Sequence, residues 1–201
     1  MSSSNRSLSQ MTDTRKPSTH LDPRAPLVLD TRELGRRPGS MRRLSFPAPA
    51  PEGLALDLVS IPAGAQLALE VRLESVMEGV LVTGTVSAPL TGECARCLDP
   101  VVSEVVTDVQ ELFAYPESVT EETTSEDEVS RLEGDYLDLE PVVRDALVLA
   151  LPLIPLCRED CRGLCPTCGE YWDRLPSDHA HEVVDPRWAA LKKLTDDTQE
   201  N

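Results

Sequence analysis

The chain has 201 residues, a formal net charge of −16, 40% hydrophobic residues and 3% aromatic residues. These values are typical of one modest domain with long polar flanks. No run approaches the roughly 18 apolar residues of a membrane helix, and residues 1–20 lack the apolar stretch of a secretory signal. We therefore expect no membrane partner and a cytoplasmic location, where thiols stay reduced.

The charge is unevenly distributed along the chain. Residues 1–43 carry nine Lys and Arg against four Asp and Glu, whereas residues 44–201 carry ten against 31. An acidic body repels nucleic acid, so a contact with RNA requires a local basic element. The densest basic element holds five arginines, Arg32, Arg36, Arg37, Arg42 and Arg43. A solvated linker is the alternative interpretation of this stretch.

The N-terminal third has few regular elements. Residues 1–26 are polar and without hydrophobic periodicity, which predicts a disordered arm. Residues 27–29 are apolar and predict a first strand, and Pro38-Gly39 predicts a turn. A stiff connector is expected next, because prolines recur at Pro47, Pro49 and Pro51.

The next sixty residues indicate β-structure. Apolar residues alternate with other residues over 54–59 and 67–74, which places one face of each strand on a core. A third apolar run covers 80–86, with a β-bulge expected at Gly84. A fourth run follows between Val101 and Phe113. The short spacers favour an antiparallel meander.

The C-terminal half predicts an acidic loop and two helices. Residues 117–135 carry eight Asp and Glu against Arg131, which predicts a mobile loop. A helix is expected after the N-cap Asp138, ending before Pro152. A short helix is expected over 185–194, followed by a polar tail over 196–201. Together with the meander, these elements predict an α+β fold with one main helix packed on the sheet.

Six cysteines have the spacing of metal ligands. One pair, Cys94 and Cys97, stands on a turn between the third and fourth expected strands. A segment over 157–169 holds the other four, Cys157, Cys161, Cys165 and Cys168. Cys-x2-Cys turns that aim two sulfurs at one point are typical of zinc sites, so zinc is the expected metal.

Two ligand sets remain open. A local set uses the four cysteines of residues 157–169, and it closes the shorter loop. A bipartite set combines Cys94 and Cys97 with two of the other four. His179 and His181 lie close enough downstream to replace a cysteine, although histidines in a polar loop are more often solvated. No catalytic motif accompanies the cysteines, and a closed four-ligand zinc site is structural, so we expect no enzyme activity.

Several segments resemble the YceD family. Glu93–Leu98 is similar to its Cys-x-Arg-Cys-Leu signature, and residues 149–157 resemble its helix exit. Residues 160–169 look like its cysteine-rich segment, and residues 185–194 resemble its closing helix. The resemblance extends over about residues 27–195. No seventh cysteine follows the segment, although many members have one.

The resemblance implies a factor in the accumulation or processing of large-subunit (23S) ribosomal RNA, without catalytic residues. Ribosomal RNA or a ribosome-assembly intermediate is then the expected partner. The five arginines of residues 32–43, together with Arg96, would form the RNA contact. The alternative is a zinc-dependent regulatory adaptor that binds a protein partner through the acidic loop.

Overall fold

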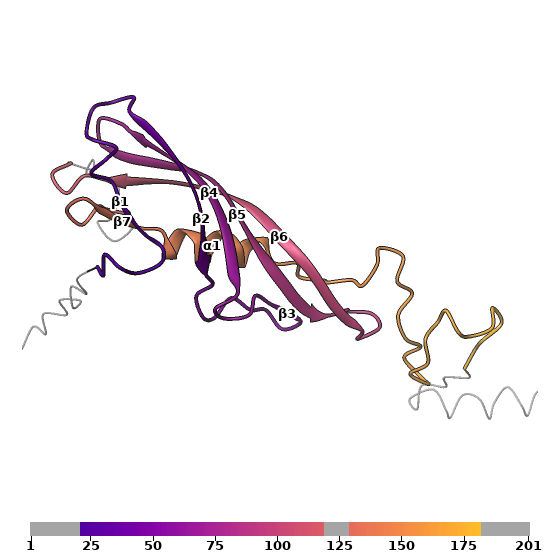
Figure 1. Ribbon diagram of the computed structural model, residues 1–201. Helices are drawn as coiled ribbons and strands as arrows, with labels where there is room; N and C mark the ends of the chain where they lie inside the picture. Colours follow the sequence, from indigo (N-terminus) through magenta and orange to yellow (C-terminus); the bar gives the residue numbers. More distant parts are fainter. Residues whose placement is uncertain (1–20, 119–128, 182–201) are drawn as a thin grey trace, which may run out of the picture. The chain divides into compact units, whose positions relative to one another are not determined.

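The computed structural model describes residues 21–118 and 129–181. Its elements are β1 Val28–Asp30, β2 Met41–Pro49, β3 Val59–Ser60, β4 Gln66–Ser75, β5 Gly79–Glu93, β6 Pro100–Ala114, β7 Tyr136–Asp138 and α1 Glu140–Ala150 (Figure 1). A five-stranded sheet has the order β2-β4-β5-β3, and β6 also pairs with β5. β1 and β7 form a separate antiparallel pair. The predicted α+β class, mostly antiparallel with one main helix, is confirmed, while the helix expected over 185–194 lies outside the described residues.

The described chain divides into two compact units. The first takes residues 21–49, 68–86 and the described part of 108–146, and the second takes residues 50–67, 87–107 and 147–181. The long strands β5 and β6 contribute residues to both units. All six cysteines belong to the second unit, and the five arginines of residues 32–43 belong to the first.

The alternation predicted for residues 67–74 forms β4. Four apolar side chains on one face are at most 3% exposed, Leu67, Leu69, Val71 and Leu73. Because successive side chains of a strand point to opposite faces, Glu70, between two of them, is left exposed. The meander is also confirmed, since β4, β5 and β6 follow one another in sequence and pair as neighbours.

The connector predicted from Pro47 and Pro49 is wrong, because both prolines lie in strand β2. Among the residues that the structure describes, β2 is an edge strand that pairs with β4 alone. An edge strand has backbone N–H groups that need no sheet partner, and proline lacks that N–H group. The prolines are therefore compatible with this strand and mark its free edge. The turn at Pro38-Gly39 is present, with Gly39 at φ 88°.

The strand predicted over residues 54–59 is also not formed. The chain turns back on itself there, because Leu56 N donates to Val59 O at 2.9 Å and Ile61 N donates to Leu54 O at 2.9 Å. Leu54 and Val59 are buried on either side of this turn. The predicted alternation matches the burial of Leu54 but not that of Val59, which was expected on the face opposite the leucines and is buried. Leu56 and Leu58 are only half-buried, and within this segment Val59–Ser60 is the part that pairs with β5.

The segment predicted as an acidic loop is described only at its ends. At the C-terminal end, Leu132 is 3% exposed and its N–H donates to Ala114 O at 2.9 Å. Arg131 donates from Nη1 to Ser118 O at 3.3 Å. Residues 130–132 therefore pack against the end of β6, which differs from the mobile loop expected over 117–135.

Helix α1 has the expected signals at both ends. The Asp138 carboxylate accepts a hydrogen bond from Glu140 N at 2.9 Å, and Arg144 pairs with Glu140 one turn away at 2.8 Å. Val143 and Leu147 are fully buried on one face. The helix ends at Ala150, two residues before Pro152, as predicted.

Candidate metal centre

The turn between β5 and β6 holds the first cysteine pair in a tight loop. Cys94 N donates to Asp99 O at 2.8 Å, and Leu98 N donates to Cys94 O at 2.9 Å. Leu98 has φ 63°, a left-handed conformation that non-glycine residues adopt at a cost. This turn keeps both cysteines buried, with Cys94 at 0% and Cys97 at 4% exposure.

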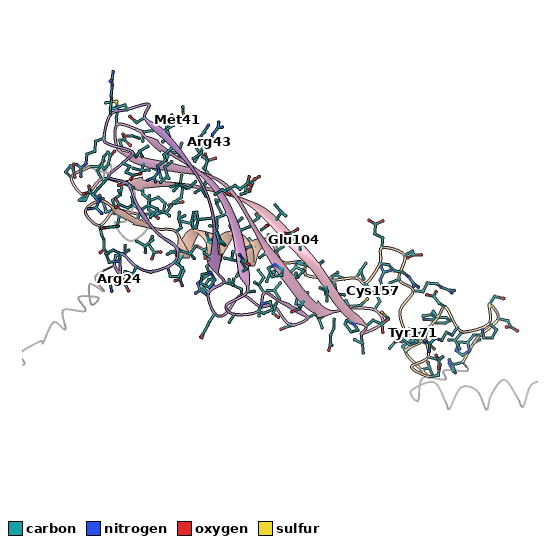
Figure 2. The ribbon with its side chains drawn as sticks, in the orientation of Figure 1. Arg24, Met41, Arg43, Glu104, Cys157 and Tyr171 are labelled. Carbon is teal, nitrogen blue, oxygen red and sulfur yellow. The ribbon has the colours of Figure 1, made fainter. Side chains whose placement is uncertain are left out.

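A second segment, which follows α1, closes over this turn. Ala95 N donates to Pro155 O at 2.8 Å, and Leu164 N donates to Arg96 O at 3.1 Å. The Arg96 guanidinium donates from Nη1 to Cys161 O at 2.6 Å. These bonds bring Cys157 and Cys161 to the first pair. Figure 2 labels Cys157 and Tyr171 in this cysteine-rich segment.

Four sulfur atoms then meet at one point. The sulfurs of Cys94, Cys97, Cys157 and Cys161 all lie within 4.8 Å of one another. Cys94 Sγ is 3.7 Å from Cys161 Sγ, and Cys97 Sγ is 3.5 Å from Cys157 Sγ. A tetrahedral zinc with Zn–S bonds of about 2.3 Å places its sulfurs roughly 3.8 Å apart. The donor set therefore fits a tetrahedral metal ion, and its cysteines are free thiols.

The thiols of the cluster differ in acidity. Burial raises the pKa of Cys94, but hydrogen bonds from the backbone of Cys157, Cys97 and Arg96 lower it further, to about 6. A backbone hydrogen bond from Asp99 lowers the pKa of Cys97, but burial and the neighbouring thiols raise it above its ordinary value. Thiols this close resist ionising together unless a cation compensates their charge.

Polar and apolar neighbours surround the cluster. Tyr171 donates its hydroxyl to Asp99 Oδ1 at 2.7 Å, while Cys97 Sγ lies 3.3 Å from Asp99 Oδ2. The hydrogen bond from Tyr171 lowers the pKa of Asp99. Val101 is buried with the cysteines, and Leu156, Leu164 and Tyr171 pack against them. Such second-layer contacts orient ligands around a metal.

The structure assembles the bipartite set rather than the local one. Cys165 and Cys168 lie in a different group, together with His179 and His181, whose ligand atoms also lie within 4.8 Å of one another. The two histidines were interpreted from the sequence as solvated. The two histidines are separated by one residue, and His179 follows Cys168 by eleven positions; this clustering after a Cys-x2-Cys pair is the signal that could have indicated ligands.

The arginines predicted to contact RNA are exposed except Arg42, which is half-buried, and most of those in residues 32–43 are paired. Arg36 forms an ion pair with Glu117 and lies over the Tyr115 ring, with its guanidinium carbon 4.7 Å from the ring centroid. Arg42 pairs with Glu33 at 2.8 Å. Arg32 pairs with Asp30 at 2.5 Å, and this carboxylate raises the pKa of Arg32.

Two arginines of this stretch differ from the others. Among the described residues, Arg37 and Arg43 are exposed and form no ion pair. Arg43 lies on β2, where Figure 2 labels it, and lines a shallow groove together with Arg72. Arg96 belongs to the second unit, and its guanidinium group donates a hydrogen bond to Cys161 O beside the four-thiol cluster. Its role in RNA contact stays a prediction.

The fold and the site define a small antiparallel β-protein with a cysteine cluster that could hold a metal ion. Within the described ranges, no helix is long and apolar enough to cross a membrane. A family model described as the large ribosomal RNA subunit accumulation protein YceD matches residues 82–195. The chain belongs to the YceD family, as the segment resemblances predicted.

Similar proteins extend over nearly the whole chain. Uncharacterized proteins of Mycobacterium bovis and Mycobacterium tuberculosis are 49% identical over 189 residues, which cover 94% of this chain and 91% of each relative. The uncharacterized protein YlbN of Bacillus subtilis is 30% identical over 111 residues, covering 55% of this chain and 63% of that protein. No solved structure matches the chain.

Proposed function

We propose that the protein is a non-enzymatic factor in the accumulation of large-subunit ribosomal RNA, and that its second unit is held together by a structural zinc ion. The observation that carries the proposal is the four-thiol cluster of Cys94, Cys97, Cys157 and Cys161 in a member of the YceD family. A closed cluster of this kind leaves no open ligand position for substrate or water.

Zinc is the metal that the donor set favours. Four soft thiolates in tetrahedral spacing suit zinc, whereas calcium and magnesium prefer oxygen ligands. The ion would join a turn between two strands to a segment 60 residues further along the chain. It would compensate the charge of the clustered thiolates and fix the position of Arg96, which donates to Cys161 O.

RNA contact is proposed for the first unit. Arg37 and Arg43 are the arginines of the basic stretch whose guanidinium groups have no ion-pair partner among the described residues. The groove lined by Arg43 also contains the polar residues Ser45 and Thr83, the acidic residue Glu70, and Arg72, which pairs with Glu74 at 3.8 Å. Phosphate groups are the complementary ligand for such exposed guanidinium groups, and they hold RNA without base specificity.

The proposal is tested by depletion in cells followed by complementation. Loss of the protein should lower the ratio of large-subunit to small-subunit ribosomal RNA, and the unaltered chain should restore it. Cys97→Ser should fail to restore the ratio and should lose one zinc per chain, whereas Ser103→Ala, an exposed change on β6, should behave like the unaltered chain.

Crosslinking and sequencing of bound RNA distinguishes the two functional classes. Enrichment of large-subunit RNA supports the proposal. A stoichiometric protein partner without RNA, together with an unchanged ribosomal RNA ratio after depletion, contradicts it and supports a regulatory adaptor.

A further inference from the structure

A second group of ligand-type side chains lies directly after the four-thiol cluster. The ligand atoms of Cys165, Cys168, His179 and His181 all lie within 4.8 Å of one another. We propose that these four residues bind a second zinc ion, distinct from the four-thiol site. The proposal rests on this group alone and does not depend on the ribosomal role.

The backbone around Cys165 repeats the turn that holds the first cysteine pair. Cys165 N donates to Glu170 O at 2.8 Å, and Gly169 N donates to Cys165 O at 2.8 Å. The same two bonds connect Cys94 with Asp99 and Leu98 in the first turn, at 2.8 and 2.9 Å. The residue after the second cysteine has positive φ in both turns, 72° at Gly169 and 63° at Leu98. The chain therefore builds the same cysteine turn twice.

The two histidines complete the set of four donor atoms. His179 Nε2 lies 3.7 Å from Cys168 Sγ, close to the roughly 3.6 Å expected when zinc binds sulfur at about 2.3 Å and nitrogen at about 2.05 Å. The rings of His179 and His181 have centroids 4.4 Å apart and lie at 87° to each other. His179 also packs edge-on against Trp172, with centroids 5.6 Å apart. Two imidazoles thus approach the cysteine turn together.

The segment lacks the apolar core that would otherwise hold it. Over residues 162–181, all of which the structure describes, Cys165 is the one buried hydrophobic residue. The segment nevertheless has an ordered series of turns, with Trp172 N donating to Gly163 O at 3.0 Å and Arg174 N to Tyr171 O at 2.9 Å. Short segments without a core are commonly held by a metal or by disulfides, and these cysteines are free.

The donor set specifies the class of metal. Two thiolates and two neutral imidazoles are borderline-soft donors that suit zinc in a closed tetrahedron. The metal complex would carry no net charge, because two thiolates compensate a divalent ion. The four-thiolate complex would carry two negative charges. The two sites therefore differ in a way that spectroscopy can detect.

The test is metal stoichiometry of the full chain, purified under reducing conditions and loaded with zinc alone. We expect two zinc ions per chain, falling to one in the double variant His179→Ala/His181→Ala. Thr167→Ala, in the same turn but without a ligand atom, is the matched control and should keep two. Cys97→Ser should also fall to one, but through loss of the other site.

Cobalt(II) in place of zinc shows which site remains. The histidine double variant should keep the spectrum of a four-thiolate site, and Cys97→Ser should keep that of a mixed sulfur–nitrogen site. If the alanine variant fails to fold, His179→Cys/His181→Cys decides, because it should retain two ions with a more thiolate-rich cobalt spectrum. Two zinc ions in a folded His179→Ala/His181→Ala variant would overturn the proposal. One zinc ion in both the unaltered chain and the His179→Cys/His181→Cys variant, with the same cobalt spectrum in both proteins, would also overturn it.

Discussion

Leu98 has a backbone conformation that is unfavourable for a residue with a side chain. It is 58% exposed, so its side chain gains little from burial, and its φ of 63° costs about 1–2 kcal/mol for a non-glycine residue. We expect Leu98→Gly to raise the free energy of unfolding by about 0.5–1 kcal/mol, since part of the gain is offset by the greater chain entropy of glycine. Denaturant unfolding of the metal-loaded protein measures this.

Leu98→Ala is the control for this prediction. Alanine keeps the backbone cost and removes the exposed side chain, so the free energy of unfolding should stay within about 0.5 kcal/mol of the unaltered protein. An equal gain in both variants would show that the exposed side chain, and not the backbone, is the unfavourable feature.

Gly84 is required by the close approach of its neighbours. A Cβ atom there would lie 2.1 Å from Glu70 O and 2.7 Å from Val71 Cα, both backbone atoms of β4. We expect Gly84→Ala to lower the free energy of unfolding by about 2–3 kcal/mol, because the two strands must move apart. Thr85→Ala, on the same strand, should cost at most about 1 kcal/mol. Equal melting temperatures for the two variants would contradict this account.

At the scale of elements, Leu132 tests whether the end of the acidic segment is part of the core. We expect Leu132→Ala to lower the free energy of unfolding by about 2–4 kcal/mol, because the side chain is 3% exposed. Leu149 on α1 is 87% exposed, so Leu149→Ala should change the free energy of unfolding by less than about 0.5 kcal/mol. Thermal or denaturant unfolding distinguishes them, and a similarly small effect at both positions would place Leu132 outside the core.

The sequence predicted the elements whose signal is local. β4 follows from strict alternation, and the ends of α1 follow from Asp138 and Pro152, because periodicity and capping act within a few residues. β2 could not be predicted, since Pro47 and Pro49 suit a connector and an edge strand equally, and only the neighbouring strand distinguishes them. The turn at residues 54–61 was missed because an alternating pattern does not show where the chain reverses, and this reversal buries Val59 in place of Leu58.

The sequence predicted which cysteines could bind a metal but not which of them group together, because the grouping depends on long-range contacts. The six cysteines were evident from spacing, but the choice between local and bipartite sets depends on where residues 155–161 fold back. That position is set by long-range bonds such as Ala95 N to Pro155 O. The histidines were missed because a polar loop gives no hydrophobic pattern that shows its direction.

At the scale of the whole molecule, the −16 charge opposes RNA binding, so the proposed contact requires arginines whose charge no carboxylate offsets, which among the described residues of the basic stretch are Arg37 and Arg43. We expect the double variant Arg37→Ala/Arg43→Ala to flatten the slope of log affinity against log salt by about 1.4–1.8, because each lost phosphate contact removes about 0.7–0.9. Binding of large-subunit RNA fragments measured over a salt series tests this.

Arg32→Ala/Arg42→Ala is the matched control. Both of these arginines pair with carboxylates, Asp30 and Glu33, so the slope should change by less than in the first variant. A larger change in the control would mean that the paired arginines exchange their carboxylates for phosphate. That result would assign the RNA contact to Arg32 and Arg42 instead of Arg37 and Arg43.

Metal removal should affect the two units differently, because all eight ligand-type residues belong to the second. We expect a chelator to abolish amide exchange protection over residues 94–98 and 155–174 while Leu69 and Val71 of β4 stay protected. Hydrogen exchange with and without chelator is the measurement. Equal loss of protection in β4 would show that the metal stabilises the whole chain as one cooperative body.

The wide separation of the first ligand pair from the second has a consequence for biosynthesis. Cys94 and Cys97 emerge from a translating ribosome long before Cys157 and Cys161, so the four-thiol site cannot close until most of the polypeptide has been made. During that interval the early pair is an open, two-sulfur ligand that can be oxidised or can bind other thiophilic ions. Binding of the proposed metal at this site would therefore belong to the last stage of maturation, and a nascent chain halted before residue 157 would lack a complete site.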